Sequence, residues 1–174
     1  MVEQSQIDEL KQKMTEQRDG LLALLERYDE EEAVKPTSGE GEWSAKQQMS
    51  HLCEMETNYR AWVAKALQEN GADLTGVYGE PPLVSLEEAN SHSVGEHVGE
   101  MKRQRAMTMA FIDSMKPEDF ERTASQKAFG LLTVMQWLRS YYRHDRMHLD
   151  QLRGIDPEYK PRYAGGNEPD QRRG

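Results

Sequence analysis

The sequence has 174 residues, which suits one ordinary domain with a single hydrophobic core. Hydrophobic residues make up 36% of the chain and charged residues 30%, a balance typical of a water-soluble fold with amphipathic elements and not of general disorder. The 22 Lys and Arg residues against 31 Asp and Glu residues give a formal net charge of -9, with no long basic run. Most of the surface would therefore repel a phosphate backbone, and we expect no nucleic-acid partner.

The beginning of the chain and its cysteine content indicate a compartment. The first ten residues are acidic and polar, whereas a signal peptide needs a basic start followed by an apolar stretch. No uninterrupted apolar run approaches the length that spans a membrane. The single cysteine, Cys53, cannot form an internal disulfide, which agrees with a reducing compartment. We therefore expect a cytoplasmic protein with no membrane association.

Apolar residues recur at steps of three and four residues in four stretches, a pattern that predicts amphipathic helices. The predicted helices cover about residues 4–31, 45–69 and 86–115, and a fourth runs from about residue 133 to near Gly154. Three of them begin with a capping box, in which a Ser or Thr is followed three residues later by Glu or Gln. These boxes are Ser44 with Gln47, Ser85 with Glu88, and Thr133 with Gln136.

The links between the predicted helices differ in length. Residues 36–42 are rich in turn formers, and the longest link runs from Asn70-Gly71 through Pro81-Pro82. Residues 120–130 have no clear period and predict a loop across one end. The chain is thus predicted to be all-α, a four-helix bundle with one longer crossover link. We assign residues 1–155 to the bundle and residues 156–174 to a C-terminal tail that is loosely ordered at its end.

Three histidines are the candidate metal ligands. His144 and His148 are four residues apart on the predicted fourth helix, so both imidazoles lie on one face. His51 shares the predicted core stripe of the second helix with Met55 and Tyr59, so it also faces inward. Three neutral nitrogen ligands would leave an open coordination position, as in catalytic zinc sites. The spacing is also compatible with a chance pair and with buried histidines that are only hydrogen-bonded.

Two segments carry a family resemblance. Glu42 to Leu52 reads EWSAKQQMSHL and is followed by Glu54, and Tyr142 to Leu152 reads YRHDRMHLDQL. In this order the two segments resemble the signature segments of the DinB-like (YfiT-like) superfamily of four-helix-bundle proteins, many of them proposed metalloenzymes. The resemblance implies that His51, His144 and His148 are the metal ligands.

The resemblance also implies a class of function. It suggests one divalent transition metal ion per chain, Zn or Ni, and a small-molecule substrate. Characterised members include thiol-dependent transferases and isomerases, so the implied activity is transfer of a low-molecular-weight thiol to a small electrophile, with a hydrolase-like reaction of metal-activated water as the alternative. The resemblance further implies a homodimer. Two alternatives stay open: a non-catalytic, metal-binding stress-response bundle, and a dimerising helical protein without metal.

Other residues that could contribute chemistry have weaker support. Glu54 and Asp145 are possible catalytic or ligand-orienting carboxylates, although each also suits an ordinary helix position. His144 to His148 resembles the zinc-protease helix motif with Asp145 in place of Glu, and no further histidine completes that ligand set. The paired Glu-x-x-His motifs of di-iron bundles are missing from the sequence.

The remaining candidates are expected to be structural. Cys53 lies roughly 200 degrees around the helix from His51 and is predicted to be a small buried hydrophobe. His92 and His97 stand among Ser, Gly and Glu, a setting that predicts solvent exposure, with an approach of His97 to a cleft as the alternative. The three tryptophans, Trp43, Trp62 and Trp137, are expected to pack in the core, with a possible second role at the rim of a pocket.

Overall fold

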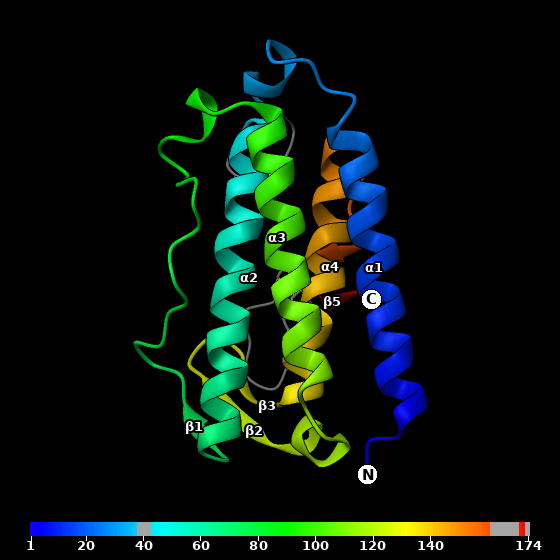
Figure 1. Ribbon diagram of the computed structural model, residues 1–174, viewed down its shortest axis with the longest axis vertical. Coiled ribbons are helices and arrows are strands. Elements are labelled where there is room, and N and C mark those ends of the chain that lie inside the picture. Colours follow the sequence, from blue (N-terminus) through cyan, green and yellow to red (C-terminus); the bar gives the residue numbers. More distant parts are fainter. Residues whose placement is uncertain (38–42, 161–170, 173–174) are drawn as a thin grey trace.

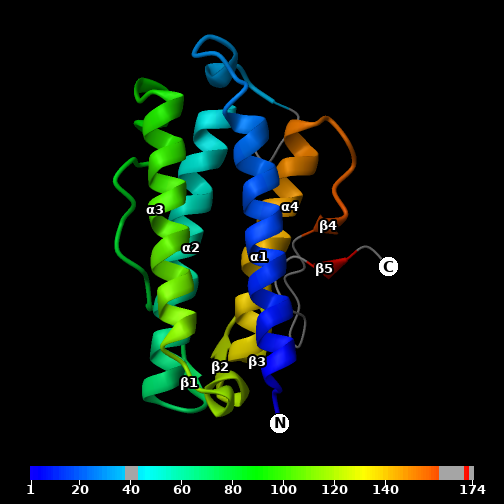
Figure 2. The same ribbon diagram turned by 45° about the vertical axis from the view of Figure 1, so that its right-hand side comes forward.

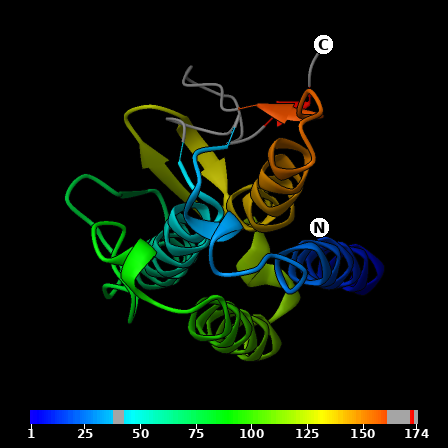
Figure 3. The same cartoon turned by 90° about the horizontal axis from the view of Figure 1, so that it is seen from above.

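Four long helices dominate the computed structural model, which describes residues 1–37, 43–160 and 171–172. They are α1 (Gln4–Leu25), α2 (Ala45–Gln68), α3 (Val94–Asp113) and α4 (Val134–Leu152). The helices lie side by side along the long axis of the molecule (Figure 1), and the view from above shows them as the corners of a bundle (Figure 3). The predicted four-helix bundle is confirmed.

The helix directions explain the long link. Following the colours from blue to orange, α1 and α4 run in one direction, and α2 and α3 run in the other (Figure 1). Because α2 and α3 are parallel neighbours, residues 69–93 must return along the whole bundle before α3 begins. This crossover is tied to α2 where Trp62 Nε1 donates to Val77 O (2.9 Å) and Gly79 N donates to Asn58 Oδ1 (2.8 Å).

Capping boxes begin α2 and α4 as the sequence predicts. Ser44 Oγ accepts from Gln47 N (3.2 Å), and Gln47 Oε1 accepts from Ser44 N (3.0 Å). Thr133 and Gln136 make the same reciprocal pair at 3.2 and 2.8 Å. Each pair satisfies backbone donors that the first helical turn leaves without a partner. Gly154, with φ of 69°, follows the end of α4.

Two predicted helix bounds are wrong. α1 ends at Leu25 and not near residue 31, and the next amides, of Arg27 and Tyr28, donate to carbonyls three residues back (both 3.1 Å). Asp29 Oδ1 then accepts from Glu32 N (2.7 Å) at the start of a separate 3-10 turn, η1 (Glu32–Val34). α3 begins at Val94 and not near residue 86. The capping box that begins it is Ser93 with Glu96, whereas the Ser85–Glu88 pair precedes only a short 3-10 turn, η3 (Ala89–Ser91).

The predicted loop at residues 120–130 is also wrong in part. After the 3-10 turn η4 (Pro117–Glu121), β2 (Thr123–Gln126) and β3 (Gly130–Thr133) form an antiparallel hairpin. β1 (Ala72–Asp73), from the start of the crossover, pairs in parallel with β2. This small sheet closes the end of the bundle where α2 ends and α4 begins (Figures 1 and 2). The two hairpin strands have only four residues each, too few for a sustained alternation, and β1 pairs with β2 from about fifty residues away in the sequence.

The predicted tail and the first turn-rich link lie partly outside the described residues. β4 (Tyr159–Lys160) pairs antiparallel with β5 (Gln171–Arg172) beside α4 (Figure 2). The expected loose order at the end of the tail concerns residues 161–170 and 173–174, which are not described. Of the link at residues 36–42, Pro36 pairs with Ser44 in an isolated bridge, and residues 38–42 are not described.

The core consists of two apolar clusters separated by buried charge. One contains Met14, Tyr59, Trp62 and Trp137, and the other contains Leu21, Leu25, Met49 and Leu52 with their neighbours. Along α1 and α2, the buried charged residues Arg18 and Glu56 fall between the two clusters. Among the described residues, no helix is both long enough and apolar enough to cross a membrane.

Candidate metal centre

The three predicted histidines meet between α2 and α4. His144 and His148 are one turn apart on α4, and His51 faces them from the second turn of α2. The ring centroid of His51 lies 5.0 Å from that of His144 and 5.6 Å from that of His148, and the two α4 rings are 4.8 Å apart. One ring nitrogen from each histidine lies within 4.8 Å of those of the other two.

This donor set fits a divalent transition metal ion. His144 Nε2 and His148 Nε2 are 3.1 Å apart. Two nitrogen ligands that share a tetrahedral ion at ordinary Zn–N bond lengths are about 3.3 Å apart. Imidazole nitrogen suits zinc, nickel, copper and iron.

Burial keeps the three imidazoles neutral. His148 is fully buried, and His144 is 5% exposed. Burial lowers the pKa of both well below the usual range, with the other imidazoles of the cluster acting in the same direction. Burial also lowers the pKa of His51 to about 4. A metal ion binds the unprotonated nitrogen of an imidazole. Since the three imidazoles are already neutral at neutral pH, none of them has to lose the extra proton of an imidazolium before it coordinates an ion.

Residues around the cluster hold the imidazoles in place. His148 Nδ1 lies 2.8 Å from Gln48 Oε1, and the Trp43 ring packs on His51 with centroids 4.9 Å apart. Gln48 was not identified from the sequence. It lies three residues before His51 on α2, so the helical period that turned His51 inward could have identified it.

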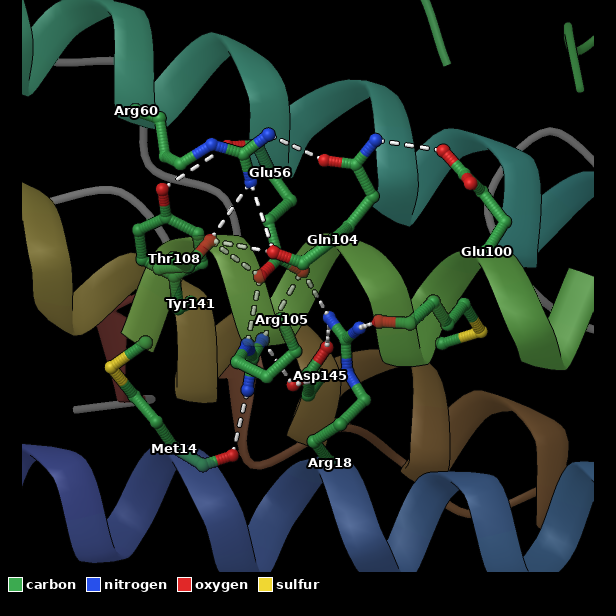
Figure 4. Close-up of polar contacts among 11 residues, drawn as sticks. Met14, Arg18, Glu56, Arg60, Glu100, Gln104, Arg105, Thr108, Tyr141 and Asp145 are labelled. Carbon is green, nitrogen blue, oxygen red and sulfur yellow. Dashed lines mark hydrogen bonds and ion pairs between the residues drawn. The ribbon is translucent and has the colours of Figure 1, made fainter. Parts of the chain in front are cut away.

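A buried charge network lies beside the histidines and joins all four helices (Figure 4). Asp145 accepts from Arg18 Nε (3.0 Å) and Nη2 (2.9 Å), and from Arg105 Nη2 (2.9 Å). Glu56 accepts from the same two guanidinium groups and from Thr108 Oγ1 (2.8 Å). Arg18, Arg105 and Glu56 were not identified from the sequence, because their partners come from distant helices.

The two candidate carboxylates, Asp145 and Glu54, lie outside the group formed by the three histidines. Asp145 follows His144 in the chain, but both of its oxygens face Arg18 and Arg105. Glu54 is exposed on α2. The structure brings neither carboxylate into the three-histidine group.

The other residues considered from the sequence have structural surroundings. Cys53 is buried, as predicted, and burial raises the pKa of its thiol. The prediction for His97 is wrong: it is 1% exposed, with Nε2 2.8 Å from Ala89 O, because the crossover packs over α3. Trp62 and Trp137 pack edge to face in the core at 5.4 Å.

Comparison with known proteins identifies the family. The family model described as DinB superfamily matches residues 13–152, which include all three histidines and most of the four helices. The chain belongs to the DinB superfamily. A curated bacterial protein matches this DinB chain as well. YuaE of Bacillus subtilis (strain 168), described as uncharacterized, is 27% identical over 140 residues, which are 73% of this chain and 84% of YuaE.

Two solved structures share the DinB bundle at low sequence identity. YfiT from Bacillus subtilis, described as a probable metal-dependent hydrolase with an unusual four-helix bundle topology, superposes with a TM-score of 0.69 at 15% identity. That match covers 88% of this chain and 87% of YfiT. A mycothiol-dependent maleylpyruvate isomerase superposes with a TM-score of 0.67 at 11% identity, covering 84% of this chain and 60% of the isomerase. Such identities show a shared fold.

Proposed function

We propose that this DinB-superfamily protein is a metal-dependent enzyme whose ion is held by His51, His144 and His148. The observation that carries the proposal is the convergence of three neutral imidazoles, from two helices, within 4.8 Å. Three protein ligands leave a coordination position for water or substrate, which distinguishes catalytic from closed structural zinc sites. Zinc and nickel, which the family resemblance implies and which accept imidazole nitrogen, are the proposed ions.

The proposed reaction is transfer of a low-molecular-weight thiol to a small electrophile. When bound, a divalent ion lowers the pKa of a coordinated thiol or water and so supplies a nucleophile at neutral pH. The thiol proton passes to solvent, the sulfur forms a bond to the electrophilic carbon, and the leaving group departs from that carbon with the electron pair of the bond that breaks. The fold shared with a mycothiol-dependent isomerase supports a thiol as co-substrate, and the fold shared with YfiT supports water as the other nucleophile.

The surroundings of the histidines support chemistry in a dry site. His148 and His144 are buried, and the Trp43 ring covers one side of His51. Excluding water strengthens the interaction of a bound nucleophile with a cation. We also propose that the protein works as a homodimer, which the mass of the particle in solution, measured by light scattering, would test.

The proposal is tested by thiol consumption. Metal-loaded protein is mixed with a panel of small thiols and with 1-chloro-2,4-dinitrobenzene, from which chloride leaves as the C–S bond forms. We expect a rate above the uncatalysed one that disappears with chelator and in His148→Ala, but persists in His92→Ala. A parallel hydrolysis screen with ester and amide substrates covers water as the nucleophile. Turnover that is indifferent to chelator in both screens would contradict the proposal.

A second function is favoured by the deep burial of His144 and His148, which would suit an ion that mainly stabilises the fold. In a non-catalytic, metal-binding stress-response bundle, the ion binds the native state and raises its stability. Chelation would then lower the melting temperature, and no substrate panel would reveal turnover. The thiol screen and the melting temperature together separate the two functions.

A further inference from the structure

The contact between Gln48 and His148 has two possible proton arrangements. Gln48 Oε1 lies 2.8 Å from His148 Nδ1, and both side chains are fully buried. The imidazole can carry its proton on Nδ1 or on Nε2, and an amide can present either its oxygen or its NH2 group. The arrangement decides which ring nitrogen of His148 carries the proton and which carries the lone pair.

A second contact of Gln48 decides between them. Thr37 Oγ1 lies 2.7 Å from Trp43 O, and since a carbonyl oxygen only accepts, the single hydroxyl proton of Thr37 is donated there. Thr37 Oγ1 is then an acceptor for Gln48 Nε2, 2.6 Å away. Gln48 Nε2 also lies 3.5 Å from Trp43 O. The NH2 group of Gln48 thus faces two acceptors, and its carbonyl oxygen faces His148.

From this relay we propose that Gln48 is a positioning residue that holds His148 as the Nδ1–H tautomer, with the Nε2 lone pair directed at the other two histidines. His148 Nδ1–H donates to Gln48 Oε1, Gln48 Nε2 donates to Thr37 Oγ1, and Thr37 Oγ1 donates to Trp43 O. The inference deepens the proposed function and rests on it for the metal. The tautomer itself is a property of the metal-free protein.

The opposite arrangement places two acceptors against each other. If Gln48 presented its oxygen to Thr37, that hydroxyl would need one proton for Gln48 and another for Trp43 O, and it has only one. If His148 carried its proton on Nε2, it could donate to His144 Nε2 at 3.1 Å, but the bare Nδ1 would face Gln48 Oε1 at 2.8 Å. In the Nδ1–H tautomer, His144 Nε2–H donates to His148 Nε2 instead, so both contacts have a donor. Buried polar atoms left without a donor are costly, so the relay has one favoured direction.

The relay also links two of the three imidazoles to one short segment. The carbonyl oxygen of Trp43 ends the relay from His148, while the ring of the same residue packs on His51. Thr37 N donates to Trp43 O as well (3.1 Å), and Pro36 pairs with Ser44. The residues that flank the link between α1 and α2 therefore set the orientation of His51 and His148 together.

The tautomer is measured first, on metal-free protein. Long-range ¹H–¹⁵N correlation spectra of ¹⁵N-labelled protein show which nitrogen of His148 carries the proton, and His148→Ala gives the assignment. We expect the Nδ1–H tautomer in the wild type. In Thr37→Val, which removes the hydroxyl while keeping the shape, we expect a mixture of tautomers. An Nε2–H tautomer in the wild type, or an unchanged spectrum in Thr37→Val, overturns the relay.

Zinc affinity is measured next, by competition with a chromophoric chelator. Loss of an outer partner of a histidine ligand lowers metal affinity by roughly 10- to 100-fold, and we expect a loss of that size in Gln48→Met. Gln48→Glu, which keeps an acceptor for Nδ1–H, should bind zinc within about tenfold of the wild type. Gln68→Met, an equivalent change at an exposed position of α2, is the matched control.

The outcomes separate this inference from the proposed function. Equal zinc affinity in Gln48→Met and Gln68→Met, with both variants folded by circular dichroism, overturns the positioning role. If Gln48→Met does not fold, Thr37→Val and Gln48→Glu carry the same comparison. A wild type that takes up no zinc contradicts the metal-dependent function, whatever the tautomer of His148.

Discussion

Replacing Glu56 with glutamine should destabilise the protein while keeping the shape of the side chain. Glu56 is 1% exposed, and its carboxylate lies between the guanidinium groups of Arg18 and Arg105 at 2.7 and 2.8 Å. The neutral amide would leave Asp145 as the one carboxylate of the network facing two buried positive charges (Figure 4). Removing one partner from a buried ion pair typically costs about 3–5 kcal/mol, since the remaining charge stays buried.

The pKa of Glu56 gives a second route to the magnitude. Burial raises this pKa, but Arg105, Arg18 and the hydrogen bonds to the carboxylate outweigh burial and lower it to about 2, from an ordinary value of 4.5. A difference of this size between folded and unfolded chains corresponds to about 3 kcal/mol of stability at neutral pH. For a chain of this length, that loss lowers the melting temperature by roughly 6–12 °C.

The sign of the pH dependence follows from the lowered pKa. The contribution of Glu56 is fully present above the pKa of the unfolded chain and is lost as the pH falls toward the folded pKa. The stability difference between wild type and Glu56→Gln should therefore fall by roughly half from pH 5 to pH 3. Urea denaturation of both proteins, followed by circular dichroism at several pH values, measures this stability difference.

The matched control is Glu54→Gln, at an exposed glutamate on the same helix. Its effect should stay within about 0.5 kcal/mol at every pH. If Glu56→Gln is as stable as Glu54→Gln at pH 7, or if its loss does not change with pH, the network does not stabilise the fold in the way described.

Three further substitutions test the packing of the bundle by urea denaturation. A Cβ on Gly79 would lie 2.3 Å from Thr57 backbone atoms. Gly79→Ala should therefore lower the free energy of unfolding by about 1–3 kcal/mol, because the added methyl group pushes the crossover off α2. An unchanged free energy of unfolding would show that the crossover moves aside without cost. A Cβ on exposed Gly99, inside α3, would meet no atom within 4 Å apart from its chain neighbours and the nearby backbone of its own helix. Gly99→Ala should therefore raise the free energy of unfolding by about 0.5–1 kcal/mol, and a loss of stability would contradict this. Thr133→Ala removes the cap of α4 and should lower the free energy of unfolding by about 1 kcal/mol. No decrease would mean that another group caps the helix.

Local sequence signals predicted the parts of the fold that local chemistry determines. The capping boxes at Ser44 and Thr133 use contacts three residues apart, and both begin helices where predicted. The Ser85 box failed because Ser93 offers an equally good one eight residues later, and only packing of the crossover selects between them. A capping pattern indicates a possible start, and tertiary contacts decide which start is used.

The site shows the same division between local and distant contacts. Helical periodicity placed His144 and His148 on one inward face and turned His51 toward the core, and the structure brings the three together. The pairing of Arg18 with Asp145 joins residues 127 positions apart, and no pattern in the sequence connects them. His97 was expected to be exposed because its neighbours are polar, but its environment is set by the crossover lying over α3.

Metal content tests the central proposal most directly. Untagged wild type, His148→Ala and His92→Ala are incubated with zinc or nickel, desalted and measured by elemental mass spectrometry, with circular dichroism to confirm folding. The three-histidine site predicts about one ion per chain in the wild type and in His92→Ala, and almost none in His148→Ala. A folded wild type that holds no ion, or a His148→Ala variant that holds as much as the wild type, would contradict the assignment of His51, His144 and His148 as metal ligands.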